Sequence, residues 1–182
     1  MRKQLLIVLC IAIFYGCGSK PEAAAETAPA AAATETTKPG PAEFADPKYA
    51  DVGKKGLALL TSGDVDGWVA SYADNAVYAW NNGDSLAGKA AISEYWKKRR
   101  SEVIETMSFS EDIWLPVKVN QPQRSEAPGV WLLGWYKVDT KYKTGKSMSQ
   151  WIHTLMHFNS EDKIDRVLQF LDRAPINAAM KK

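Results

Sequence analysis

Apolar residues follow two different patterns over residues 47–182. In the first half of this range they recur every three to four positions, as at Val52 and Leu59, and this spacing is typical of amphipathic helices. Gly63 is a helix-stop signal, and Asp64 can cap the helix that follows. The pattern predicts three helices, over residues 49–61, 64–72 and 89–100.

The second half is rich in β-branched and aromatic residues, which favour strands. Four segments predict strands, over residues 107–119, 130–141, 147–159 and 163–171, and a shorter strand is predicted over 76–80. Residues 121–129 contain two prolines and predict a long loop. Helices followed by antiparallel strands predict an α+β domain in which the helices pack on one sheet face.

The start of the chain matches a secretory signal. Two basic residues precede an apolar run over 5–15, and Gly16 and Cys17 follow. A basic start, an apolar core of about 7–15 residues and a small residue before the cut are typical of such signals. The run is shorter than the roughly 20 residues that span a membrane. Gly16-Cys17 resembles a bacterial lipobox, so we expect residues 1–16 to be removed and Cys17 to be lipidated. The alternatives are cleavage elsewhere or a retained anchor.

Residues 17–46 are dominated by Ala, Pro, Thr and Glu, with almost no large apolar residue before Phe44. Such a segment buries too little apolar surface to offset the entropy of ordering. We expect a flexible linker over 17–46 and a single domain over 47–182. The lipid on Cys17 would attach this domain to a membrane of the bacterial cell envelope.

Charge and histidine content narrow the function classes. The chain has 23 basic and 21 acidic residues, and two of the basic ones lie in the predicted signal peptide, so the rest is formally neutral. Neutrality gives no support for a nucleic-acid partner. His153 and His157 are the only histidines, and four residues along a strand separate them by about 13 Å. That is too far to share one metal ion, so we predict neither a metal site nor a cofactor.

Several stretches, taken with the order of elements, resemble the nuclear-transport-factor-2-like (NTF2-like) superfamily, which includes SnoaL-like polyketide cyclases and ketosteroid isomerases. The matching stretches are residues 63–66 (GDVD), 72–76 (YADNA), 86–89 (LAGK), and 157–158 (HF) through 162–164 (DKI) to 170–172 (FLD). The resemblance covers about residues 48–172. It implies a cone in which three N-terminal helices pack on a curved antiparallel sheet.

The resemblance also implies where catalytic residues would lie. In ketosteroid isomerases a tyrosine and two aspartates converge in the cone, and the matching positions here are Gly56, Trp80 and Thr154. Glycine and tryptophan cannot replace the tyrosine and the general base. We therefore assign no catalytic residue and expect no isomerase chemistry.

Strand alternation starting from an inward Thr154 predicts the lining of the cone. On this basis, the predicted pocket residues are Trp80, Trp131, Leu133, Trp135, Gln150, Thr154, Met156 and Gln169. Apolar walls with few polar groups are typical of small-molecule sites. The alternative is that the tryptophan side chains fill the cone.

The opposite sheet face is predicted to be apolar as well. It would carry Val130, Leu132, Tyr136 and Val138, and on the next strand Trp151, His153, Leu155 and His157. A second copy is the simplest cover for such a face, and family members commonly dimerise through the sheet, so we expect a homodimer.

Three functions follow from these patterns. The first is a membrane-anchored domain that binds a small apolar or aromatic molecule in the cone without catalysis. The second is a SnoaL-like or polyketide-cyclase-like enzyme, with Asp172, Tyr78 or His153 inside the cavity. The third is an envelope protein-interaction module that uses the sheet or the loop 121–129. An ionisable side chain in the cavity favours the enzyme, and a filled cone favours the interaction module.

Overall fold

The computed structural model describes residues 38–124 and 126–181. The predicted signal peptide, Cys17 and most of the predicted linker lie outside these residues. Within them, no helix is both long and apolar enough to cross a membrane.

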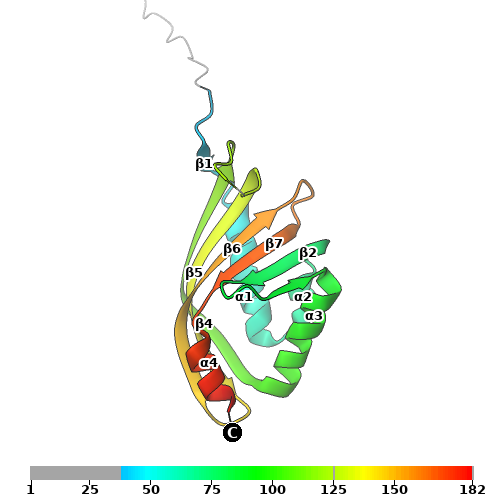
Figure 1. Cartoon of the computed structure of the whole chain (residues 1–182), viewed down its shortest axis with the longest axis vertical. Helices are drawn as coiled ribbons and strands as arrows, with labels where there is room; N and C mark the ends of the chain where they lie inside the picture. The colour runs from blue at the N-terminus through cyan, green and yellow to red at the C-terminus, as the bar shows by residue number, and fades with distance from the viewer. Residues whose placement is uncertain (1–37, 125, 182) are drawn as a thin grey trace, which may run out of the picture. The chain divides into compact units, whose positions relative to one another are not determined.

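Short helices and one long curved sheet make up the domain (Figure 1). The helices are α1 (Lys48–Ser62), α2 (Val65–Val69), α3 (Lys89–Lys98) and α4 (Arg173–Met180), and a π-helical segment (Arg99–Val103) follows α3. The strands are β1 (Ala42–Phe44), β2 (Tyr72–Trp80), β3 (Ser85–Ala87), β4 (Ile104–Val119), β5 (Gly129–Tyr142), β6 (Ser147–Phe158) and β7 (Ile164–Phe170). The predicted α+β class is confirmed.

The chain turns between α1 and α2 as the sequence predicted. Gly63 adopts a φ of 83°, and its amide and the next one donate to carbonyls of the last turn of α1. The carboxylate of Asp64 accepts from the Gly67 amide at 2.8 Å and so caps α2. This helix is shorter than expected, because residue 72 already begins β2.

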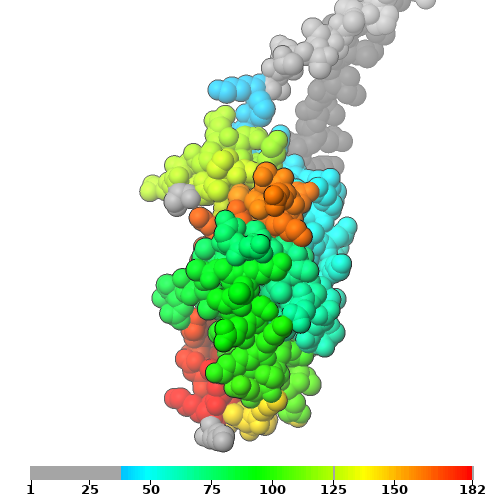
Figure 2. All heavy atoms as spheres, turned by 90° about the vertical axis from the view of Figure 1, so that its right-hand side faces the viewer, coloured from blue at the N-terminus to red at the C-terminus, as the bar shows by residue number. Residues whose placement is uncertain are grey.

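The seven strands have the order β1-β4-β5-β6-β7-β2-β3, and all neighbours are antiparallel except β2 and β7. The long strands curve around the helices, which lie on the concave face (Figure 1). Figure 2 shows the face on which α3 and β2 lie together at the surface, with α1 beside them.

Trp114 fixes how closely α1 approaches the sheet. Its indole ring packs against two glycines, Gly53 of α1 and Gly134 of β5, where an added Cβ would overlap the ring. The ring nitrogen donates to Asp112 at 2.7 Å. Two glycines without side chains therefore make the space that this indole ring occupies.

The predicted inward orientation of Trp131, Leu133 and Trp135 is wrong. Directly paired residues of antiparallel strands share a sheet face, and Thr154 pairs with Gly134. The even-numbered residues of β5 therefore face the helices, and the three predicted residues face outward. Val130, Leu132, Tyr136 and Val138, which were predicted to face outward, share the inward face. Both faces of β5 are apolar, so the alternation did not show which one was buried.

Three elements were not predicted from the sequence. β1 lies within the segment expected to be linker, yet it pairs with Val117–Val119 of β4. β3 pairs with β2 through only three residues, and α4 is eight residues long. Elements this short carry little pattern of their own and depend on the contacts they make.

Candidate ligand-binding site

A cavity of about 110 Å³ lies between the concave face of the sheet and the helices. Its lining comes from all four α-helices and from β2, β4, β5, β6 and β7. The aromatic part of the wall comprises Trp68, Tyr72, Tyr78, Trp80, Tyr95, Trp96, Phe109, Tyr136 and Tyr142. Aliphatic and methionine side chains complete the wall, so the cavity favours an apolar occupant.

Four buried side chains in this wall form one hydrogen-bond network. The indole nitrogen of Trp80 donates to Oε1 of Gln169 at 3.2 Å. The amide nitrogen of Gln169 lies 3.3 Å from the Tyr136 hydroxyl and 3.4 Å from the Thr154 hydroxyl, and these two oxygens are 2.8 Å apart. The network satisfies these groups internally and fixes their rotamers.

Three polar groups on uncharged side chains of the wall also lack a hydrogen-bond partner in the described part of the chain. They are the Tyr72 hydroxyl, the Trp96 indole nitrogen and the Thr140 hydroxyl. All three side chains are more than nine-tenths buried. A buried polar group without a partner costs about 1–3 kcal/mol, so each of them would gain from a polar atom of an occupant.

The ionisable groups of the inner wall are tyrosines. Burial raises the pKa of Tyr72 and Tyr78 well above the ordinary phenol value, and it also raises the pKa of Tyr136. These phenols therefore stay neutral at physiological pH. Among the described residues that line the cavity there is no Asp, Glu or His.

Comparison with solved structures identifies the fold. A proposed polyketide cyclase from Xanthomonas campestris superposes with a TM-score of 0.58 at 14% identity, covering 72% of this chain and 96% of that one. A proposed isomerase from Bacillus subtilis gives 0.57 at 17% identity, covering 72% and 91%. A protein of ketosteroid-isomerase-like fold from Catenulispora acidiphila, in complex with trimethylamine, gives 0.53 at 11% identity, covering 71% and 92%.

The chain has an NTF2-like fold. The predicted cone of helices on a curved sheet is confirmed. Identities this low establish the fold and leave the activity open. No protein-family model matches the chain, and no curated protein is matched by its sequence.

The predicted pocket residues fall into two groups in this NTF2-like fold. Trp80, Thr154, Met156 and Gln169 line the cavity. Gln150 lies outside the lining, where its amide bridges the backbone N–H and C=O of Asp172 at 2.9 and 3.2 Å. Trp131, Leu133 and Trp135 of β5 lie on the outer face of the sheet.

The positions matched to isomerase catalytic residues all lie on the cavity wall. Gly56, Trp80 and Thr154 come from α1, β2 and β6, and the structure brings them around one space. Gly56 has only a hydrogen atom as its side chain, Trp80 has an indole ring and Thr154 has a hydroxyl group. None of the three side chains is a carboxylate or a phenol.

The residues named for an enzyme are scattered. Tyr78 lines the cavity, but its pKa is raised by burial. Asp172 accepts from the Ala174 amide at 2.8 Å and caps α4. His153 stacks on Trp135 on the outer face, with ring centroids 4.5 Å apart.

His157 also lies away from the cavity. Its Nδ1 is 2.6 Å from a carboxylate oxygen of Asp165, and its Nε2 is 3.1 Å from the carbonyl oxygen of Pro128. These contacts tie the end of the loop 121–129 to the sheet. In the described part of the chain, no group of three or more His, Cys, Asp or Glu side chains is placed to hold a metal ion.

Sequence reasoning missed two arginines of the lining. Arg99 follows α3, and its guanidinium lies over the Tyr95 ring at 5.6 Å. Arg173 begins α4, and its guanidinium lies over the Trp80 ring at 5.4 Å. Arg99 belongs to a basic run that is typical of a solvated helix face, and no sequence signal separates it from its neighbours.

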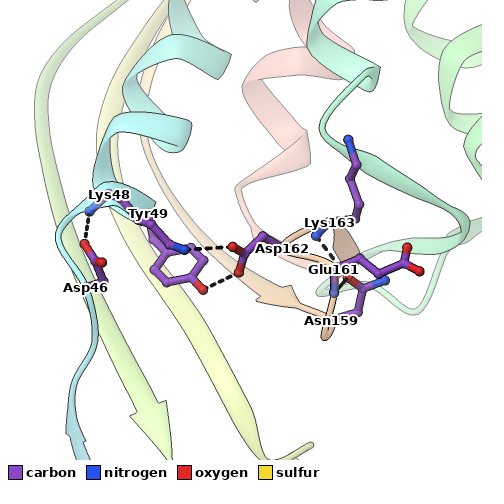
Figure 3. Close-up of polar contacts among 7 residues, drawn as sticks. All are labelled: Asp46, Lys48, Tyr49, Asn159, Glu161, Asp162 and Lys163. Atoms are coloured by element: carbon purple, nitrogen blue, oxygen red, sulfur yellow. Dashed lines mark hydrogen bonds and ion pairs between the residues drawn. The ribbon is translucent and has the colours of Figure 1, made fainter.

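A polar cluster fastens the start of α1 to the turn between β6 and β7 (Figure 3). Asp162 accepts from the Tyr49 hydroxyl and from the Lys48 ammonium, the latter at 2.7 Å. These hydrogen bonds, from Lys48 first and Tyr49 second, lower the pKa of the Asp162 carboxyl. Since the groups of this cluster are committed to one another, we assign it a structural role.

Proposed function

We propose that the domain binds a small, compact apolar or aromatic molecule in the cavity, without catalysis. The observation that carries this proposal is an apolar cavity whose wall keeps three buried, uncharged polar groups without a partner. Such a wall combines a favourable environment for a ring or alkyl group with a few donors that orient it.

The size of the cavity limits the ligand to about one ring. Sites for drug-sized molecules occupy roughly 300–1,000 Å³. A cavity of about 110 Å³ is closer to the apolar cavity of about 150 Å³ that admits benzene or xenon. We infer that a fused polycyclic molecule such as a steroid does not fit in the ligand-free form.

The chemistry of the wall supports binding over catalysis. A general base must be within hydrogen-bond reach of the substrate and must titrate near the working pH. The tyrosines of the inner wall are held neutral by burial, and the four-residue network has its hydrogen bonds made internally. This wall can orient a ligand, but it offers no group to take a proton from it.

Anchoring is a separate part of the proposal and rests on the sequence alone. We propose that the lipid on Cys17 holds the protein on a membrane of the bacterial cell envelope. Mass spectrometry of the membrane-bound protein tests this. We expect a diacylated or triacylated N-terminal Cys17, and an unmodified chain starting at another residue would contradict it.

We also propose that the outer sheet face pairs with a second copy of the chain. Ile113, Trp135, His153 and Phe170 form a continuous row across four strands, since each is paired directly with the next. Ile113 is 58% exposed, Phe170 is 40% exposed and the nearby Trp151 is 51% exposed. A two-fold axis would let this row cover itself, and the chain without its predicted signal peptide is formally neutral and adds no net repulsion.

Sedimentation analysis tests the pairing. We expect a dimer for the natural chain and a monomer for Trp151→Glu, because a carboxylate at the centre of an apolar interface is costly. A natural chain that stays monomeric at all concentrations would contradict this part, and would leave the outer face to another protein partner.

Calorimetric titration with benzamide tests the binding function. This probe has one ring and a carbonyl oxygen that can accept from the unpartnered donors. We expect saturable one-to-one binding that is lost in Gly56→Leu, which fills the cavity. Trp135→Ala is the matched control, because it removes a large side chain from the outer face and should leave binding unchanged. Unchanged binding in Gly56→Leu would refute the site.

A further inference from the structure

The only charged side chains in the described lining of the cavity are Arg99 and Arg173. Both are partly exposed, so they lie at the rim where the cavity meets solvent. Arg99 follows α3 and Arg173 begins α4, and they lie over two neighbouring rings of the wall, Tyr95 and Trp80. One end of the cavity is therefore framed by two cations from different elements.

Both guanidinium groups lie against the aromatic wall. Arg99 lies over Tyr95 at 5.6 Å and Arg173 over Trp80 at 5.4 Å, while the two rings are 5.3 Å apart. Stacking on a ring restrains the planar guanidinium and leaves its N–H edges available for hydrogen bonds. The two cations are thus held next to the rings that a ligand in the cavity would touch.

The negative charge near these cations does not balance them. Among the described residues, Arg99 has no carboxylate within 4.0 Å. Arg173 has one, an oxygen of Asp84 at 3.2 Å from Nη2, and this carboxylate is 61% exposed. The Nε atom of Arg173 is buried and without a hydrogen-bond partner. A half-desolvated guanidinium with an unused N–H is suited to a carboxylate, which accepts two N–H bonds side by side.

We propose that the natural ligand is a compact cyclic or aromatic carboxylate, with its ring in the cavity and its carboxylate at the rim between Arg99 and Arg173. This inference rests on the proposed function and adds the charge of the ligand to it. The rim attracts and orients the anion, and the neutral inner wall accommodates the ring. An amine or other cation is disfavoured, because both charged groups of the lining are positive.

The test compares benzoate with benzamide, which has the same shape and no charge. We expect benzoate to bind at least about tenfold more tightly at low ionic strength, a factor that corresponds to about 1.4 kcal/mol. Hydrogen bonds between charged groups commonly contribute that much. The preference should shrink as salt is added, because the rim is partly exposed.

Variants separate the role of the rim from the role of the cavity. In Arg99→Gln/Arg173→Gln we expect benzoate and benzamide to bind with similar affinity, and retained benzamide binding shows that the protein is folded. Arg166→Gln is the matched control, since this arginine is exposed on the outer sheet face. It should keep the full preference for benzoate.

The outcomes distinguish this inference from the function beneath it. Equal affinities in the natural chain, or a preference that survives in the double variant, would overturn the carboxylate while leaving the cavity as a binding site. Failure of both probes to bind would overturn both proposals.

Discussion

The change in the free energy of unfolding caused by Gly56→Leu is a sharp test of the cavity. Gly56 lies within α1 and faces the cavity. A Cβ at this position would lie 3.5 Å from the nearest atom, on the Trp68 ring, which is ordinary van der Waals contact. The first carbon of the new side chain therefore fits without movement, and the remainder extends into empty apolar space.

The expected change in the free energy of unfolding has three contributions. Replacing glycine by leucine inside a helix gains about 0.8 kcal/mol. Burying the leucine side chain gains about 1.5–3 kcal/mol. Loss of rotamer freedom costs about 0.5–1 kcal/mol. We therefore expect the variant to be more stable by about 1–3 kcal/mol, and to bind no benzamide.

Urea unfolding followed by tryptophan fluorescence measures this change. Ala58→Leu is the control, because Ala58 lies on the exposed side of the same helix and the change should stay within about 0.5 kcal/mol. A loss of stability of more than about 1 kcal/mol in Gly56→Leu would refute the reasoning, since it would mean that this space is already occupied.

Three further predictions concern single contacts. Gly134→Ala places a Cβ against the Trp114 ring and should lower the free energy of unfolding by about 1–3 kcal/mol in urea unfolding; an unchanged midpoint would show that the ring can move aside. Thr140→Val removes a buried hydroxyl without a partner and should raise the free energy of unfolding by about 1 kcal/mol, whereas a loss would reveal a partner for it. The lowered pKa of Asp162 means that its stabilising effect is present above the ordinary aspartate value of 3.8 and is lost as the pH falls through the lowered value. Asp162→Asn should therefore lower Tm near neutral pH and have little effect in strong acid, and an equal effect at both would contradict the contribution of the Tyr49 and Lys48 contacts.

The sequence was informative where structure is determined locally. The stop at Gly63 and the cap at Asp64 are set by backbone conformation and a hydrogen bond within a few residues. The long strands are marked by their composition. Alternation placed Thr154 and Gln169 in the lining, where the structure has them, but it also placed Gln150 there, which lies outside the lining.

The sequence failed where the answer depends on a partner strand or a distant element. The direction in which β5 faces is set by its pairing with β6, and an apolar residue on either face would fit the pattern equally well. Arg173 reaches the cavity only because α4 packs against the end of the sheet, and this helix is too short to be predicted alone. The charge at the rim of the cavity was therefore not visible in the sequence.

Whether the cone contains a cavity that accepts a guest is the central claim, and xenon binding in crystals of the protein tests it most directly. Xenon enters apolar cavities of about this size without requiring any polar contact. We predict one ordered xenon atom between α1 and the sheet, near Gly56 and Thr154, and none at that place in Gly56→Leu. Side chains that fill this space, with no xenon inside the cone, would contradict the account.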